Sequence, residues 1–231
     1  MAIELYDLVG ADEKRSFSPF CWRVKMALAH KELEIKTIPW HFTDKEAIAF
    51  SGQGKVPVII DGENVVCDSW MIANYLENNY SDRPSLFGSL EAKSHALFIK
   101  NWSEKVLAKS LFPLLIKDVY YHLNEKDKIY FRQTREQFLG QTLEEFSSDR
   151  QKNLENFRQV LIPLRETLAV QSFLAGDRPN FADYIVFGYF QWARCISELK
   201  LLETNDPIYS WREKMLSIFD GMAAKAVGYE V

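Results

Sequence analysis

The chain has 231 residues, of which 47% are hydrophobic, and a formal net charge of −4. This length and apolar content suffice for one large domain or for two small ones with cores of their own. The slight negative charge gives no electrostatic reason to expect a nucleic acid or an anionic membrane as a partner, so we expect neither.

The first ten residues lack the basic start and apolar segment of a secretory signal, and no apolar run is long enough to span a bilayer. Cys21, Cys67 and Cys195 are an odd number of widely spaced cysteines. They predict free thiols and a reducing, cytoplasmic location. The four histidines have no metal-ligand spacing to one another or to the cysteines, so we expect no metal site.

The first third of the chain alternates between strand and helix patterns. Residues 2–8 form a short apolar run typical of a strand. Residues 19–31 carry apolar side chains at three- and four-residue steps, which predicts a helix. Residues 33–39 return to a strand pattern.

A hairpin and a helix follow in the pattern. Residues 55–60 and 64–67 are rich in β-branched side chains and flank Asp61-Gly62, a strong hairpin signal. Residues 69–79 are again helical in pattern. The order strand–helix–strand, then strand–strand–helix, predicts a thioredoxin-like α/β domain over residues 1–84.

Beyond this domain nearly every pattern is helical. The polar, proline-containing stretch 81–85 is typical of a linker, so we expect an all-helical domain over residues 90–231. Pro113 and Pro163 are expected to kink or delimit helices. The charged stretch 124–128 is interpreted as a surface connection.

Ser18 and Pro19 stand between the first predicted strand and the first predicted helix. Serine is a favoured N-cap and proline a favoured first helical residue, so the pair predicts a helix start at Pro19. Capping alone is worth about 1 kcal/mol and suffices to explain Ser18. A hydroxyl beside the free N–H groups of a helix N-terminus also stabilises an anion such as a thiolate. Ser18 is therefore a candidate for both roles.

Cys21 follows Ser18 by three residues. The segment thus has serine where a disulfide oxidoreductase has the reactive first cysteine of its C-P-x-C motif, which argues against dithiol chemistry. We expect Cys21 to be a packed thiol and the reactive sulfur to come from a ligand. A redox enzyme that uses Cys21 remains the alternative.

Two further positions are candidates for ligand binding. Pro57 is compatible with a strand start, and a cis Val56–Pro57 peptide would be needed to present the Val56 backbone to an extended peptide ligand. Asp68 and Ser69 open the next helix, where either is a possible cap. In a site, Ser69 would hold a carboxylate of the ligand and Asp68 would lie near its ammonium group.

Ser18, Val56-Pro57 and Asp68-Ser69, in this order within a thioredoxin-like pattern, resemble the glutathione site of the glutathione transferase family. The resemblance implies the fold of that family, with glutathione as co-substrate. It further implies that Ser18 hydrogen-bonds the glutathione thiolate, that Val56 pairs with the cysteinyl backbone, and that Asp68 and Ser69 hold the γ-glutamyl group.

Other segments extend this resemblance over essentially the whole chain. The Phe20 backbone would lie near the thiolate. Residues 175–183 resemble the buried capping motif of the family, in which Asn180 caps a helix and Asp183 reaches back to it. More narrowly, the chain resembles the etherase-type transferases of lignin-degrading bacteria and a related fungal class. The segments that carry this narrower resemblance are 17–25, 130–136, 138–145 and 190–194.

The narrower resemblance implies attack by the glutathione thiolate on a hydrophobic electrophile, aromatic or aryl-ether in type, by a homodimer. Two related classes differ at the site. Omega and glutaredoxin-like relatives have cysteine where Ser18 stands, which would give thiol exchange. Zeta-type isomerases share much of the segment 22–25 but have cysteine where this chain has Phe20. A glutathione-dependent isomerase and a non-catalytic binder of glutathione or hydrophobic ligands therefore remain alternatives.

The sequence leaves two parts of such a site open. His41 and Lys45 are candidates to bind the glycine carboxylate of glutathione. The acceptor pocket should lie between the domains, facing the first and fourth helices. Four aromatic residues are either walls of that pocket or core residues, namely Phe98, Trp102, Tyr120 and Tyr121.

Overall fold

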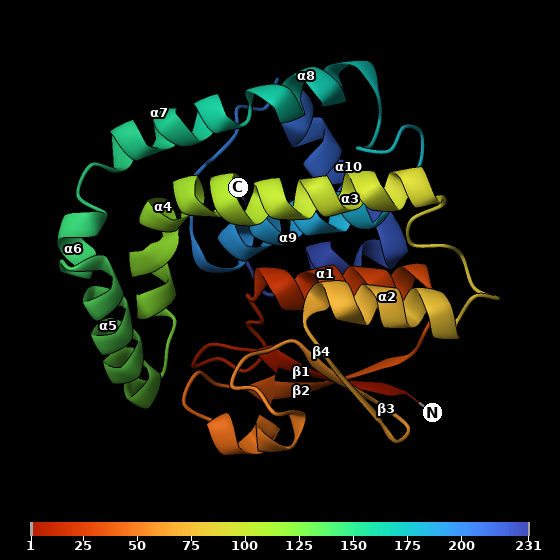
Figure 1. Cartoon of the computed structure of the whole chain (residues 1–231). Coiled ribbons are helices and arrows are strands. Elements are labelled where there is room, and N and C mark those ends of the chain that lie inside the picture. Colours follow the sequence, from red (N-terminus) through yellow and green to blue (C-terminus); the bar gives the residue numbers. More distant parts are fainter. Residues whose placement is uncertain (1, 231) are drawn as a thin grey trace.

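The computed structural model describes residues 2–230, and its N-terminal part is built on a four-stranded mixed sheet (Figure 1). The strands are β1 (Ile3–Leu8), β2 (Ile35–Trp40), β3 (Val58–Asp61) and β4 (Asn64–Cys67). The order in the sheet is β2-β1-β3-β4, with β1 and β2 parallel and β3 antiparallel to both β1 and β4. This confirms the predicted thioredoxin-like arrangement.

Three helices accompany the sheet. They are α1 (Pro19–His30), η1 (Lys45–Ser51) and α2 (Ser69–Asn79). Helices α1 and α2 lie between the sheet and the helical half, and η1 lies on the opposite side of the sheet (Figure 1). The sheet and α1 share a core, in which Leu5, Val24 and Val58 are fully buried. Burial of this kind is the main favourable contribution to folding.

The rest of the chain is helical, as predicted. Its elements are α3 (Leu90–Trp102), the π-helical segment η2 (Ser103–Leu107), α4 (Ala108–Tyr121), α5 (Glu125–Leu139), α6 (Leu143–Phe146), α7 (Arg150–Val160), α8 (Ile162–Val170), α9 (Phe181–Ile196) and α10 (Pro207–Lys225). Helices α3 and α4 follow one another through η2 without an intervening loop, and α4 bends away from the line of α3 (Figure 1). None of the helices within residues 2–230 is long and apolar enough to cross a membrane.

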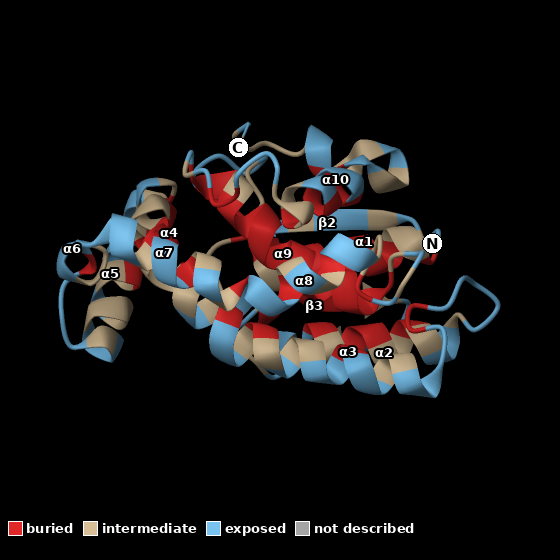
Figure 2. Cartoon of the chain, turned by 90° about the horizontal axis from the view of Figure 1, so that it is seen from above, coloured by how far each residue is buried: buried red, intermediate tan, exposed pale blue. Residues whose placement is uncertain are grey.

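Helix α9 is the centre of the helical half. Every one of its residues except Arg194 is buried, and Figure 2 shows it as a red rod enclosed by the other helices. It packs along α1 from the N-terminal half. Gly188 allows the closest approach, because a Cβ at this position would overlap the carbonyl oxygen of Pro19. The first turn of α1 therefore rests on the backbone of α9.

The N-terminus of α9 is the predicted buried cap. The Asn180 side chain accepts a hydrogen bond from the backbone N–H of Ala182 at 2.8 Å. The Asp183 carboxylate accepts from the N–H of Asn180 at 3.0 Å, from the N–H of Leu174 at 2.9 Å and from the indole N–H of Trp211 at 2.9 Å. The capping interpretation of Asn180 and Asp183 is confirmed.

The expectation for residues 124–128 is wrong. These residues are not a connection but the cap and first turn of α5, where the Asn124 side chain accepts from the N–H of Asp127 at 2.9 Å. The overlooked signal is an asparagine followed at once by acidic residues, which stabilise a helix N-terminus. Pro163 delimits α8 as expected, and Pro113 lies inside α4.

Candidate functional site

A cavity of about 960 Å³ lies between the N-terminal and helical halves. Its walls come from the start of α1, the segments on either side of η1, and helices α4, α5 and α9. Nine of its 22 lining residues are aromatic, namely Phe17, Phe20, Trp40, Phe42, Phe112, Tyr130, Phe131, Tyr189 and Trp192. The charged residues in the lining are Lys45, Lys55, Glu104, Lys109 and Arg135. A hollow of this size and lining is typical of a small-molecule site.

Ser18 is the N-cap of α1 and lines this cavity. Its hydroxyl accepts a hydrogen bond from the backbone N–H of Cys21 at 3.2 Å, which leaves its own proton to be donated elsewhere. Pro19 has no N–H, and the N–H of Phe20 has no intrahelical acceptor, because it lies in the first turn. The first turn of α1 contains no acidic residue. The positive end of this helix is thus open to an anion from outside the chain.

Behind the wall formed by Phe20 and Tyr189 lies a buried charge. The Arg23 guanidinium is 4.5 Å from the Phe20 ring centroid and 5.1 Å from that of Tyr189. It donates to Glu104 at 3.0 Å, and Lys100 approaches the other oxygen of that carboxylate at 3.1 Å. Burial opposes ionisation of Glu104, but these two cations lower its pKa overall. The pair joins α1 to η2 and holds the aromatic wall in place.

Val56 lines the cavity just before β3, and the Val56–Pro57 peptide is cis. Pairing of β3 with β4 begins at Val58 opposite Cys67, so Val56 lies outside the paired part of the sheet. Asp68 and Ser69 directly follow β4 in the chain, just as Val56 and Pro57 directly precede its antiparallel neighbour β3. The structure therefore gathers these four predicted residues at one end of the β3–β4 hairpin.

Asp68 and Ser69 are nevertheless not part of the cavity lining. Asp68 is the cap of α2, with its carboxylate accepting from the N–H of Trp70 at 2.9 Å and of Met71 at 3.1 Å. Its φ of 69° lies in the left-handed region, which is uncommon for a residue other than glycine. Ser69 is buried beside it.

Of the two candidates for a carboxylate contact, Lys45 lines the cavity and His41 does not. The Lys45 ammonium lies 4.8 Å from the Trp40 ring centroid and donates to the Gly54 carbonyl at 2.6 Å. The His41 ring is instead 3.1 Å from the Asp44 carboxylate.

The four aromatic residues considered as pocket walls do not line the cavity. Phe98 is 67% exposed and Tyr121 is 61% exposed on the outer surface. Trp102 and Tyr120 are half-buried and pack against the core instead. Helical spacing shows which residues share a face but not which face a distant segment covers. The expected position between the halves, against α1 and α4, does match the structure.

Cys21 is fully buried, and its burial, reinforced by the negative charge of Asp7, raises the pKa of its thiol. The thiol therefore stays protonated at neutral pH, as the packed-thiol interpretation expects. Cys67 and Cys195 are free thiols as well. In the described part of the chain, no three or more His, Cys, Asp or Glu side chains are grouped so as to hold a metal ion.

One contact that shapes the cavity was not predicted from the sequence. Asp127, in the first turn of α5, is fully buried and accepts from the N–H of Phe42 at 2.9 Å and the N–H of Thr43 at 3.0 Å. Its carboxylate also accepts from the Thr43 hydroxyl at 2.8 Å. This contact fastens α5 to the loop after β2, so that Tyr130, Phe131 and Arg135 close one side of the cavity.

Two family models match the chain. The model described as glutathione S-transferase, N-terminal domain, matches residues 14–84. The model described as glutathione S-transferase, C-terminal domain, matches residues 94–215.

Individual curated relatives are distant. A zeta-class glutathione S-transferase of Euphorbia esula is 29% identical over 110 residues, which are 46% of this chain and 47% of the relative. The glutathione S-transferase-like protein ustS of Aspergillus flavus is 30% identical over 141 residues, 54% and 49% of the two chains. The chain thus spans about half the length of these two relatives. Glutathione S-transferase 4 of Zea mays is 25% identical over 221 residues, 94% and 88% of the two chains.

Solved structures with the same fold include two fungal proteins. A glutathione S-transferase of Ceriporiopsis subvermispora, determined in complex with glutathione, has a TM-score of 0.80 and 24% identity, with 95% of this chain and 97% of that chain covered. Glutathione transferase GSTFuA3 of Phanerochaete chrysosporium has a TM-score of 0.78 and 26% identity, with 97% and 94% covered.

Proposed function

The chain belongs to the glutathione S-transferase family, and we propose that it is a serine-type transferase in which Ser18 activates the thiol of bound glutathione. The thiolate attacks a hydrophobic electrophile, with aromatic and aryl-ether compounds as the preferred class. The observation that carries this proposal is the open N-terminus of α1, where the N-cap Ser18 lines the cavity and the first turn contains no acid.

The magnitudes are sufficient for this role. A free cysteine thiol has a pKa of about 8.5, and lowering it by two units takes roughly 2.7 kcal/mol of preference for the thiolate. A hydrogen bond to a charged group contributes about 1.5–3 kcal/mol, and a helix N-terminus about 0.3–1 kcal/mol. The Ser18 hydroxyl together with the Phe20 N–H can supply the whole amount.

The remainder of glutathione fits the surrounding groups. The Val56 backbone lies outside the paired strands and can pair with the cysteinyl unit. The γ-glutamyl group reaches the start of α2, where Asp68 and Ser69 directly follow β4. Lys45 is the candidate for the glycine carboxylate, because it lines the cavity whereas His41 does not.

The acceptor occupies the part of the cavity walled by aromatic side chains. Phe20, Phe112, Tyr189 and Trp192 come from three different helices and face this space. In the reaction the sulfur forms a bond to the electrophilic carbon, and the leaving group departs with its bonding electrons. The thiol proton has been released to solvent before the attack. Proximity of the two bound reactants supplies much of the rate.

The proposal extends to two properties of the whole protein. The resemblance to its family implies a homodimer, which light scattering of the purified chain tests directly. The three free cysteines favour a reducing, cytoplasmic location.

Product analysis tests the proposed reaction against its rivals. The chain is incubated with glutathione and, in turn, an activated aryl chloride, a β-aryl ether and a dienoic acid. A glutathione thioether from either of the first two supports the proposal. An isomerised dienoic acid without thioether would identify an isomerase of zeta type. Binding of glutathione with no product from any of the three would identify a non-catalytic binder.

The matched control is Cys21→Ser. Thioether formation should be unchanged in this variant, because the Cys21 thiol is buried and protonated. A reductase activity of the wild type that disappears in Cys21→Ser would instead show a redox enzyme.

A further inference from the structure

Arg135 is a cation in the wall of the cavity without an anionic partner. Its guanidinium lies 4.7 Å from the Phe131 ring centroid and 5.3 Å from that of Phe42. It donates a hydrogen bond to the neutral hydroxyl of Thr134 at 2.9 Å, and the Tyr130 side chain is a second hydrogen-bond partner without a carboxylate. Within residues 2–230 no carboxylate forms an ion pair with it.

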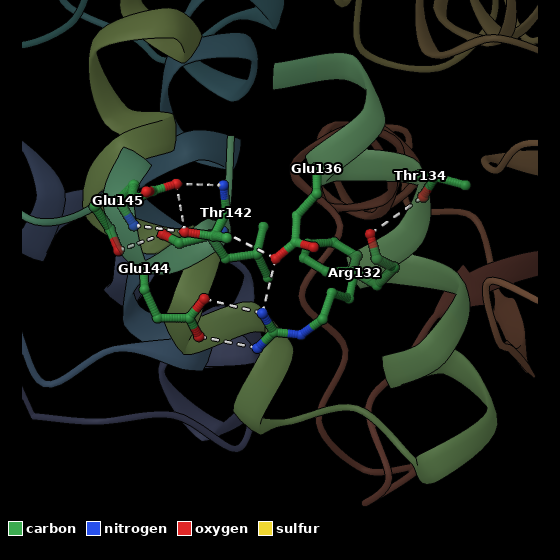
Figure 3. A network of polar contacts seen from close by, with 9 residues as sticks. Arg132, Thr134, Glu136, Thr142, Glu144 and Glu145 are labelled. Carbon is green, nitrogen blue, oxygen red and sulfur yellow. Dashed lines mark hydrogen bonds and ion pairs between the residues drawn. The ribbon is translucent and has the colours of Figure 1, made fainter. Parts of the chain in front are cut away.

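Arg132, one turn earlier on α5, shows the contrast. Figure 3 shows its guanidinium between two carboxylates, with both nitrogens 2.9 Å from Glu144 and one of them 2.7 Å from Glu136. These ion pairs connect α5 to α6 on the side away from the cavity, since Arg132 is not part of the lining. The two arginines of α5 therefore differ in their partners. Arg132 is paired with two carboxylates, and Arg135 is paired with none in the described part of the chain.

An unpaired and half-buried guanidinium is unfavourable. Burial removes water from the charge and lowers the pKa of Arg135. Folded proteins usually offset such a loss with a carboxylate at hydrogen-bonding distance. The aromatic rings of Phe42 and Phe131 provide only the weaker cation–π attraction. The missing anion can come from a ligand, because Arg135 lines the cavity.

The charges around the cavity agree with this view. Four cations line it, namely Lys45, Lys55, Lys109 and Arg135. The single carboxylate in the lining is Glu104, which is already paired with Arg23 and Lys100. The cavity thus favours ligands with negative charge.

Glutathione alone does not account for all these cations. Its two carboxylates are assigned above to the start of α2 and to Lys45, both in the N-terminal half. Arg135 comes from the helical half and lies among the aromatic walls. Its position is also firmly held, since Asp127 fastens α5 to the loop after β2 and Arg132 fastens it to α6 (Figure 3).

We infer, building on the proposed function, that the acceptor substrates are aromatic electrophiles bearing a carboxylate, and that Arg135 binds this carboxylate. The group is a recognition handle and stays unchanged in the reaction. The sulfur of glutathione forms its bond to an electrophilic carbon elsewhere on the acceptor.

The test compares two electrophiles of nearly the same shape, the anionic 4-chloro-3-nitrobenzoate and the neutral 4-chloro-3-nitrobenzamide. In each, the sulfur bonds to the ring carbon that carries chlorine, and chloride leaves with the bonding pair. We expect Arg135→Gln to lower kcat/KM for the benzoate by about tenfold to one hundredfold, the range for loss of a hydrogen bond to a charged group. The value for the benzamide should change less than about twofold, and Arg135→Lys should recover part of the benzoate rate.

Lys126→Gln is the matched control. It removes the same charge from the exposed first turn of the same helix, outside the cavity. The ratio of the two kcat/KM values should therefore stay at its wild-type value in this control. A ratio that falls equally in Lys126→Gln and Arg135→Gln would show a general effect of charge and would overturn the inference.

Equilibrium binding separates this inference from the proposed function. The ligands are glutathione and the two product thioethers, S-(4-carboxy-2-nitrophenyl)glutathione and its carboxamide, each titrated into wild type and Arg135→Gln. Tighter binding of the carboxylate by wild type, lost in the variant, supports the role of Arg135 even if neither electrophile is turned over. A preference that survives Arg135→Gln overturns it. Weaker binding of glutathione itself, with an unchanged ratio of the two thioethers, would assign Arg135 to glutathione and also overturn it.

Discussion

The N-termini of α1 and α9 are built from similar parts and face different surroundings. Each begins at a short polar cap, Ser18 in one and Asn180 in the other, that accepts a backbone hydrogen bond from its own first turn. Helix α9 carries its own anion, Asp183, which three N–H donors contact inside the core. Helix α1 has no acid in its first turn and opens into a cavity. A helix N-terminus therefore has a purely structural role where the chain itself supplies the negative charge. Where the chain supplies none, the N-terminus can bind an anionic ligand.

The largest effect we expect is on stability, from Asp183→Ala. The substitution leaves the N–H groups of Leu174 and Asn180 and the indole N–H of Trp211 without their acceptor in the core. The free energy of unfolding should fall by about 3 kcal/mol or more. Urea unfolding followed by tryptophan fluorescence measures it. A decrease in the free energy of unfolding of less than about 1 kcal/mol would show that the buried α9 cap contributes no more to stability than an exposed cap does.

Ser18→Ala should have the opposite effect, with a large loss of activity and a small loss of stability. The loss of a hydrogen bond to the thiolate should lower kcat/KM by about tenfold to one hundredfold, because such a bond contributes about 1.5–3 kcal/mol and the Phe20 N–H remains. Its cost in stability should be that of an N-cap, about 1 kcal/mol. Steady-state kinetics and urea unfolding of the same preparation give both numbers. If Ser18→Ala and Asp183→Ala lost equal activity per folded molecule, the separate roles would be contradicted, namely a catalytic role for Ser18 and a structural role for Asp183.

Gly188→Ala tests the connection between the two helices. The added methyl would meet the Pro19 carbonyl, so α1 must move away from α9 at the residue that follows Ser18. Overpacking of this kind destabilises by about 1–3 kcal/mol. We also expect a weaker affinity for glutathione, measurable by calorimetry, because the start of α1 is displaced. An unchanged affinity at reduced stability would show that the site tolerates this displacement.

The buried acid of α9 should also make the stability of the protein depend on pH. Burial raises the pKa of Asp183 from 3.8 to about 6, despite the three N–H donors that lower it. Between these two values the folded chain holds a proton that the unfolded chain has released. Stability from this group is therefore highest below pH 4 and is lost as the pH rises toward 6, by on the order of 1 kcal/mol per pH unit.

The control for this effect is Asp183→Asn, which does not titrate. The difference in unfolding free energy between wild type and Asp183→Asn should fall from pH 4 to pH 6 and be level above it. A difference that rises over this range would show that the three donors outweigh burial and hold the carboxyl pKa low.

Local signals explain which features could be predicted from the sequence. The Ser18–Pro19 helix start, the Asp61–Gly62 hairpin and the Asn180–Asp183 cap each depend on residues a few positions apart, and the structure contains all three. The thioredoxin-like arrangement of the strands was predicted from the order of the strand and helix patterns, and the structure has it.

The walls of the cavity depend on contacts between distant segments, which patterns do not reveal. Asp127 bonds to backbone groups some 84 and 85 positions away, at Thr43 and Phe42. Without that contact nothing in the sequence marks Arg135 as a residue of the cavity. The position of Phe98 could not be predicted for the same reason. Helical spacing does not show whether another segment covers a given face of α3, and Phe98 lies on an exposed face.

The most direct test of the central claim is a pH titration of the ultraviolet absorbance of the glutathione thiolate, bound to wild type and to Ser18→Ala. We predict a bound-thiol pKa about two units below the free value of roughly 8.5 in wild type, and a return toward the free value in Ser18→Ala. The same pKa in both proteins would contradict the account, because the open end of α1 would then bind glutathione without activating it.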